Sequence, residues 1–294
     1  MDQDPKSTKI SLGPPCCLQF SPTDGSVLLA GTYTLHKENG TRTGSIERYE
    51  LQTGELILTE EVKVESAILD LKFIDPTRFI TAQSTGNIML WNLGKNIELL
   101  RNVQIFEEDV LVTSITIGDD QLGITSTTGS VATVSRETLQ VTQIYESIHS
   151  LECWCLNFNE GVIYSGGDDA KLNLIDPRIG MVTRSLRHDA GVTSILPWKG
   201  SLLSGSYDDN IRRIDISSFR EVEKHNLGGG VWRLTPQGDE LLVNCMYDGA
   251  KILNSDLEVT KILSKNHTSI CYGGAWKDDS LATCSFYDKV IQLW

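Results

Sequence analysis

Long apolar runs are missing from this sequence of 294 residues. No stretch approaches the roughly 18 consecutive apolar residues that a membrane-spanning helix needs. The first ten residues, MDQDPKSTKI, contain no apolar core, so they do not resemble a secretory signal peptide. We therefore expect a protein of the cytoplasm that does not bind a membrane.

Positive charge is also scarce. Lys and Arg together number 26 against 39 Asp and Glu, and the formal net charge is −13. Because the basic residues are dispersed along the chain, the surface should repel a phosphate backbone. The charge balance argues against nucleic acid as a ligand and favours a cationic partner or substrate.

Familiar catalytic signatures are absent too. The sequence holds no G-x-S-x-G elbow, P-loop, H-E-x-x-H or dinucleotide-binding fingerprint. Most of the seven cysteines lie in apolar strand patterns, as reduced buried thiols do. Cys153 and Cys155 form a pair, but no second Cys or His pair stands near it. We expect neither a metal nor a cofactor.

What the sequence does contain is a repeat of about 40 residues. Each unit has an apolar strand, a tight polar turn and a second alternating strand, and a further short apolar run precedes them. Such a period with four short strands per unit is typical of a β-propeller. The aligned turn positions, 39 to 43 residues apart, are Thr43, Thr85, Thr128, Asp169, Asp208, Asp248 and Asp288.

Two further positions identify the kind of repeat. Trp91 and Trp294 lie six residues after their turn, at the place of the Trp in the WD dipeptide. His149, His188 and His267 precede their turn Asp by 20 or 21 residues, where WD repeats carry a histidine. The fold class predicted is all-β, a seven-bladed WD-repeat β-propeller.

The ends of the chain should close the ring. The seventh unit stops at its third strand, at Trp294, and a propeller avoids exposed sheet edges. The segment 7–12, which contains Lys9-Ile10-Ser11-Leu12, precedes the first unit and is the candidate for the missing strand. We predict one propeller domain over residues 1–294, monomeric, with a long polar loop from Tyr33 to Thr43.

Residues at the starts of first strands and just before the turns should meet at one mouth of the central channel. In units 4 to 7 they are Glu152, Cys153, Trp154, Asp168, His188, Asp189, Tyr207, Trp232, Arg233, Tyr247, His267, Tyr272 and Tyr287. In units 1 to 3 they are Ser66, Asp70, Ser84, Thr113 and Thr127. Large aromatics at a solvent-facing rim exceed what a structural repeat requires, so units 4 to 7 are the candidate site.

Structural explanations compete for several of these residues. Buried histidines of the repeat should bridge the loop to strand hydroxyls and the turn Asp, and turn Asp residues bond their own backbone. Trp154, Trp232 and Tyr272 could equally plug the channel. Arg233 on a first strand needs a partner such as Glu152 or Asp70, or an anionic ligand group.

The strings YSGGDDAKLNLIDPR from Tyr164, GGVWRL from Gly229, CMYDGAKILN from Cys245 and LATCSFYD from Leu281, together with SGSYDD and H-x4-YG-x2-W, resemble the diphthine methylesterase family of WD-repeat proteins. The resemblance covers roughly Glu152 to Trp294 and is weak over the first three units. It implies hydrolysis of a methyl ester on methylated diphthine of elongation factor 2, late in diphthamide biosynthesis.

The resemblance gives the mouth residues roles. An aromatic cage for the trimethylammonium group of the substrate would consist of Trp154, Tyr207, Trp232, Tyr272 and Tyr287. Glu152 would be the general base, Arg233 would stabilise the oxyanion, and His188 is the alternative base. Cys245 and Ser285 are possible nucleophiles but sit in packed strand patterns. The alternative is a non-catalytic adaptor or scaffold that binds elongation factor 2 or another protein.

Overall fold

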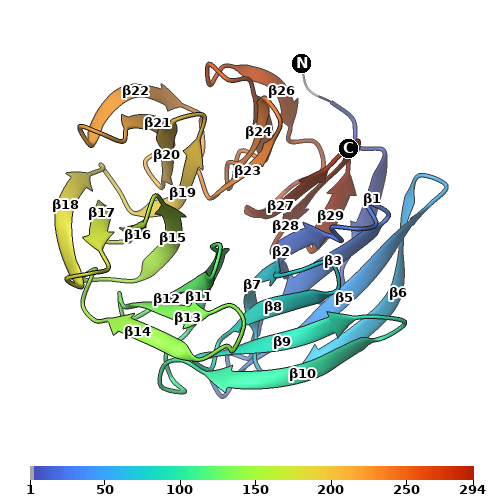
Figure 1. The fold of residues 1–294 in the computed structure, drawn as a ribbon. Coiled ribbons are helices and arrows are strands. Elements are labelled where there is room, and N and C mark those ends of the chain that lie inside the picture. The colour runs from blue at the N-terminus through green and yellow to red at the C-terminus, as the bar shows by residue number, and fades with distance from the viewer. Residues whose placement is uncertain (1–2) are drawn as a thin grey trace.

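Seven antiparallel sheets surround a central axis in the computed structural model, which describes residues 3–294 (Figure 1). Every regular element in this range is a strand. Within the same residues there is no helix with the length and apolar character that a membrane crossing requires. The predicted all-β, seven-bladed propeller is confirmed.

We number the sheets as blades in chain order. Blades 1 to 3 comprise β2 (Pro15–Phe20), β3 (Val27–Thr32), β4 (Thr34–Leu35), β5 (Arg42–Gln52) and β6 (Glu55–Val64); β7 (Ile68–Phe73), β8 (Arg78–Gln83), β9 (Asn87–Leu93) and β10 (Ile97–Gln104); β11 (Val112–Ile117), β12 (Gln121–Ser126), β13 (Val131–Ser135) and β14 (Val141–Tyr145).

Blades 4 to 7 comprise β15 (Cys153–Asn159), β16 (Val162–Gly167), β17 (Lys171–Asp176) and β18 (Met181–Arg187); β19 (Val192–Trp198), β20 (Ser201–Ser206), β21 (Asn210–Asp215) and β22 (Arg220–Asn226); β23 (Arg233–Gln237), β24 (Glu240–Asn244), β25 (Ala250–Leu253) and β26 (Val259–Leu263); β27 (Cys271–Lys277), β28 (Ser280–Ser285), β29 (Val290–Leu293) and β1 (Ser7–Ile10).

The apolar core is divided among the interfaces between blades. Seven clusters of buried side chains occur, and each joins two adjacent blades. Second strands are almost wholly buried because a blade covers each of their faces, whereas outer strands such as β18 and β22 are mostly exposed. Burial of apolar area between neighbours therefore holds the ring together.

Both ends of the chain complete blade 7. Strand β1 pairs antiparallel with β29, from Ser7 opposite Leu293 to Ile10 opposite Val290. Figure 1 shows the N-terminal strand lying beside the C-terminal one. The predicted closure is confirmed, with the strand ending at Ile10 rather than Leu12.

Blade 1 departs from the repeat. The polar segment predicted as a long loop folds back as a hairpin, in which Thr34 of β4 pairs with Thr43 of β5. Assigning Thr43 to the turn was therefore wrong, because β5 extends past the repeat boundary to meet β4. The other six turn positions lie between the second and third strands of their blades.

The Trp and His residues of the repeat make hydrogen bonds to strand hydroxyls, as predicted for the histidines, but their partners differ between blades. The indoles of Trp91 and Trp294 each donate to a threonine hydroxyl of the second strand at 2.8 Å. His149 joins Asp169 (2.8 Å) to Ser165 (2.9 Å). His267 bonds two strand hydroxyls instead of the turn Asp. His149 is buried and His267 is half-buried, and both bond within the fold.

Candidate functional site

The inner strands share an irregularity at one end of the channel. In six blades the first strand has a β-bulge that leaves one residue without a partner. A bulge re-aims the side chain of its extra residue. The bulge residues are Cys16, Leu69, Thr113, Trp154, Thr193 and Tyr272, and Trp232 lies immediately before β23 in blade 6.

Aromatic rings from blades 1, 4, 5, 6 and 7 meet at this end. Trp232 is central, because its ring centroid lies 4.8 Å from Tyr272, 5.7 Å from Trp154 and 5.8 Å from Tyr207. Such separations and tilted planes are favourable for aromatic pairs. We call this group, with the members added below, the aromatic cluster.

The cluster continues into blades 7 and 1. The Phe286 ring stands edge-on to those of Tyr272 and Tyr287, with centroid separations of 5.6 Å and 5.0 Å. The centroid of the Tyr33 ring lies 6.1 Å from that of Phe286. Tyr287 is 72% exposed, so the cluster extends to solvent. The structure thus brings together all five aromatic residues predicted from sequence and adds Phe286 and Tyr33.

Two carboxylates flank the cluster in blade 4. Asp168 accepts a hydrogen bond from the Trp154 indole (3.2 Å), and its own backbone N–H donates to the Glu152 carbonyl (2.8 Å). Asp168 and Tyr207 can both lie against the backbone of residue 191 because this residue is a glycine. A Cβ at Gly191 would lie 2.7 Å from Asp168 Oδ1 and 3.0 Å from a ring atom of Tyr207. Burial raises the pKa of Tyr207, and Tyr272, Asp168 and Glu152 raise it further.

The Glu152 side chain is half-buried and makes no hydrogen bond to any residue in 3–294. Its backbone carbonyl accepts the N–H of Asp168, whose side chain bonds Trp154, so Glu152 lies beside the cluster. A carboxylate with unused acceptor capacity beside a partly open mouth can take a proton from water.

Arg233 has a different partner from Glu152. Its Nη1 donates to Asp70 Oδ1 at 2.9 Å, and these residues lie on β23 and β7, on opposite sides of the central opening (Figure 1). The contact therefore crosses the channel below the aromatic cluster. Asp70 was one of the partners that the sequence suggested for this arginine.

Asp70 is fully engaged. It is 2% exposed and accepts backbone N–H groups of Leu71 (3.0 Å) and Ile115 (3.1 Å). Lys72 Nζ lies 3.5 Å from its Oδ1. Burial by itself would raise the pKa of Asp70, but the charges of Arg233 and Lys72 hold it below its usual value.

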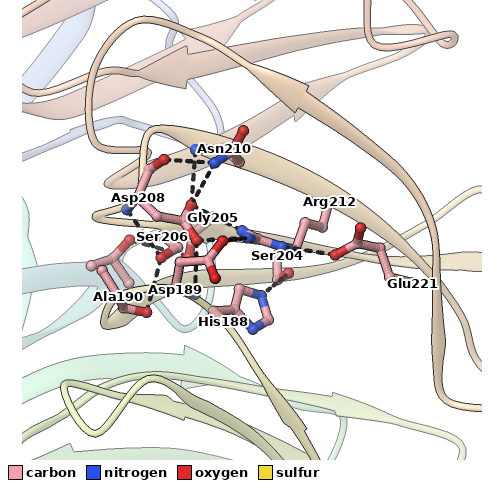
Figure 2. A network of polar contacts seen from close by, with 11 residues as sticks. His188, Asp189, Ala190, Ser204, Gly205, Ser206, Asp208, Asn210, Arg212 and Glu221 are labelled. Atoms are coloured by element: carbon pink, nitrogen blue, oxygen red, sulfur yellow. Dashed lines mark hydrogen bonds and ion pairs between the residues drawn. The ribbon is translucent and has the colours of Figure 1, made fainter.

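His188 belongs to a separate network in blade 5. Figure 2 shows its Nε2 against Ser204 (2.8 Å), close to Arg212, which bridges Asp208 and Glu221. His188 is 3% exposed, and burial together with Arg212 lowers its pKa to about 4. Because the imidazole of His188 is buried and bonds Ser204, a structural role is favoured over that of a general base.

The two candidate nucleophiles are sealed as well. Cys245 and Ser285 are each 0% exposed. Burial raises the pKa of Cys245 to about 12, and Ser285 bonds His267 within blade 7 (2.6 Å). Neither side chain can reach a substrate in this structure.

Sequence reasoning missed three contributors. Phe286 stands next to Tyr287 in the string CSFYD, so its neighbour was a signal for it. Lys72 follows Asp70 by two residues on the same inner strand, which places both on one face. Tyr33 directly follows the second strand of blade 1, as Tyr207 follows that of blade 5, and the strings AGTY and SGSY share this pattern. Placing the turn of the first unit at Thr43 concealed this signal.

Curated relatives cover almost the whole chain. Diphthine methyltransferase of Saccharomyces cerevisiae is 34% identical over 96% of this chain and 95% of its own length. The chain belongs to the diphthine methyltransferase family. Diphthine methyltransferase of Schizosaccharomyces pombe is 32% identical over 99% of this chain and 97% of its own. A diphthine methyltransferase homologue from Dictyostelium discoideum is 27% identical over 94% of this chain and 95% of its own length.

Two further comparisons bear on family and fold. No family model matches the sequence. Among solved structures, a chain in the crystal structure of the mitotic checkpoint complex superposes with a TM-score of 0.81. The superposition covers all of this chain and 92% of that chain, with 16% sequence identity. At this identity the likeness supports the propeller fold alone. The relatives' names refer to diphthine, which agrees with the predicted place in diphthamide biosynthesis, but they name a methyltransferase where the sequence suggested a methylesterase.

Proposed function

We propose that this protein hydrolyses the methyl ester of methylated diphthine on elongation factor 2, a late step of diphthamide biosynthesis. One observation supports it above the others: an aromatic cluster, a half-buried carboxylate and a channel arginine share one mouth. Membership of the diphthine methyltransferase family supports a role at the diphthine stage of diphthamide biosynthesis. The net charge of −13 suits a basic region of a protein partner in the cytoplasm.

The aromatic cluster would hold the trimethylammonium group of the substrate. Ring faces attract a quaternary ammonium, and they do so best when they are only partly hydrated. Trp154, Tyr207, Trp232 and Tyr272 are all half-buried. Asp168 beside Trp154 adds negative charge to this region.

Hydrolysis would then take place beside the cluster. Glu152 takes a proton from water, and the hydroxide formed attacks the ester carbonyl carbon. Negative charge collects on the carbonyl oxygen, where Arg233 stabilises it. The carbon–oxygen bond to the methoxy group breaks, and methanol leaves with the proton from Glu152. His188 is not needed, since its ring is buried.

The relatives' name describes a competing reaction, in which diphthine gains a methyl group. Incubating purified protein with elongation factor 2 that carries methylated diphthine, in water enriched in oxygen-18 and without a methyl donor, separates the two. We expect loss of one methyl group and one oxygen-18 in the resulting carboxylate, measured by mass spectrometry of the modified peptide.

The opposite outcomes are equally clear. A methyl group gained only when a methyl donor is supplied would establish the transferase and overturn the esterase. Binding of the modified factor with no change in mass would indicate an adaptor. Oxygen-18 incorporation that persists in a Glu152→Gln, Arg233→Gln double variant would point to a contaminating esterase.

A further inference from the structure

The charges in the channel are not balanced. Asp70, Arg233 and Lys72 form one group of two cations and one carboxylate. Burial lowers the pKa of Lys72, and the charge of Asp70 opposes this effect. The thiols of Cys17 and Cys284 lie near enough to influence the group, but burial raises their pKa values, so they are neutral and add no negative charge. The group therefore carries about one unit of excess positive charge, in a protein whose net charge is −13.

The excess charge is on the accessible side. The carboxylate is 2% exposed, whereas the side chains of Arg233 and Lys72 are 17% and 25% exposed. Only Nη1 of Arg233 donates to a described residue. Its Nε and Nη2 remain available, and this edge of a guanidinium fits a carboxylate through two parallel hydrogen bonds.

We propose that Arg233 and Lys72 form a subsite for a carboxylate below the aromatic cluster, so that the mouth takes a quaternary ammonium carboxylate as one ligand. The ammonium half of this ligand rests on the proposed function. The carboxylate half corresponds to the product of ester hydrolysis. The site should therefore hold its zwitterionic product more tightly than the ester substrate, which carries the ammonium charge but no carboxylate.

The two halves of the site are close together. Trp232 of the aromatic cluster is bonded directly to Arg233 along the chain. Asp70 and Lys72 follow the bulge residue Leu69, which lies at the same end of its first strand as the bulge residues Trp154 and Tyr272 do in blades 4 and 7. The guanidinium and the cluster are therefore neighbours at one end of the channel, as binding of one short molecule to both requires.

Three small probes test the subsite on the full-length protein. N,N,N-trimethylglycine carries both charges, its primary amide lacks the carboxylate, and choline carries only the ammonium. Binding is measured by tryptophan fluorescence and by calorimetry. We expect trimethylglycine to bind about tenfold more tightly than its amide, which corresponds to about 1.4 kcal/mol.

A lysine variant and its control sharpen the test. Lys72→Gln removes one cation and should reduce the tenfold preference to about threefold or less, while choline binding stays unchanged. Lys63→Gln, an exposed position on β6, should leave the preference intact. Circular dichroism melting of each variant shows that the fold is kept.

The outcomes distinguish the subsite from the proposed function. Equal binding of trimethylglycine and its amide, or a preference that survives Lys72→Gln, overturns the carboxylate subsite while choline binding preserves the aromatic cage. Carboxylate-dependent binding without any choline binding supports the subsite and removes the cage. Failure of trimethylglycine to bind at all overturns the inference.

Discussion

Blades 4 to 7 and blades 1 to 3 contribute different chemistry to the same mouth. The first group supplies most of the aromatic rings and the flanking acids, Glu152 and Asp168. The second supplies Asp70 and Lys72, which form the charged group in the channel together with Arg233 of blade 6. A closed ring makes this division possible, because residues on opposite blades face each other across the channel. The sequence pointed to units 4 to 7 as the candidate site, and the contact of Arg233 with Asp70 extends that site into blade 2.

The largest effect is expected where the two halves meet. Asp70→Asn removes the buried carboxylate and leaves Arg233 and Lys72 without their counter-charge. Breaking a buried pair in this way costs about 3 kcal/mol. Urea unfolding should show this loss of free energy, and hydrogen exchange should accelerate in both blade 2 and blade 6.

The control for that variant is a surface pair. Asp239 is 90% exposed and pairs with Lys199, so Asp239→Asn should change the free energy of unfolding by less than about 1 kcal/mol. If Asp70→Asn costs no more than Asp239→Asn, the contact across the channel does not couple the halves.

Removing the central ring tests the aromatic half. Trp232→Ala takes away the side chain that contacts three other rings of the cluster, so a quaternary ammonium loses its main binding face. A loss of about 2 kcal/mol corresponds to roughly 30-fold weaker binding of choline, measured by calorimetry.

Trp276 provides a matched control, because it lies at the far end of the same strand as Tyr272. Trp276→Ala should leave choline binding unchanged. Equal weakening by both variants would show that the effect comes from general destabilisation and would remove the cage from the site.

Turnover tests the carboxylate of blade 4. Glu152→Gln keeps the size of the side chain but cannot take a proton, so we expect at least about a tenfold fall in kcat with little change in KM. Ester loss from elongation factor 2, followed by mass spectrometry, gives both constants. Glu146→Gln, an exposed position ahead of the same blade, should retain full turnover; a fall of equal size there would contradict the assignment.

The smallest expected effect is a loss of folding stability at mildly acidic pH. The pKa values of His188 and His267 are lowered to about 4, chiefly by burial, against about 6.5 in an unfolded chain. Stability from each neutral ring is therefore complete above pH 6.5 and declines as pH falls towards 4. Between pH 8 and pH 6 the loss is about 1 kcal/mol per histidine.

This decline should be confined to one half of the ring. Blades 1 to 3 hold only His36, which is exposed. Hydrogen exchange at pH 8 and pH 6, corrected for intrinsic rates, should show faster opening in blades 5 and 7 than in blades 2 and 3. Uniform acceleration around the ring would contradict the assignment of these histidines as the cause.

The repeat made most of the fold predictable. The spacing of the turns, the Trp and His positions and the unpaired last unit depend on local patterns, and each fixes the strands of its own blade. Blade 1 was mispredicted at Thr43, because the hairpin with Thr34 replaces the turn of the repeat. No local pattern distinguishes a polar loop from a polar hairpin of this length.

The candidate site was predictable in part. Trp154, Trp232 and Tyr272 lie at the starts of first strands, and Tyr207 and Tyr287 lie just after second strands. Both kinds of position recur in every repeat and open on the same face, so the convergence of these five residues follows from the repeat alone. Lys72 and the orientation of Asp70 could not be inferred in the same way. Both residues also fit the ordinary polar pattern of an inner strand, and the arginine that pairs with Asp70 is 163 residues away in the sequence.

The sequence alone determined the number of blades, the closure of the ring by both ends of the chain, and four of the five blades that supply aromatic side chains to the mouth. Tertiary structure decided which side chains meet across the channel. Arg233 could have paired with Glu152 or Asp70 on chemical grounds, and the geometry of the ring places Asp70 opposite it. Pairing across a channel depends on the angle between blades and the depth of each residue along its strand, and no local pattern in the chain encodes either.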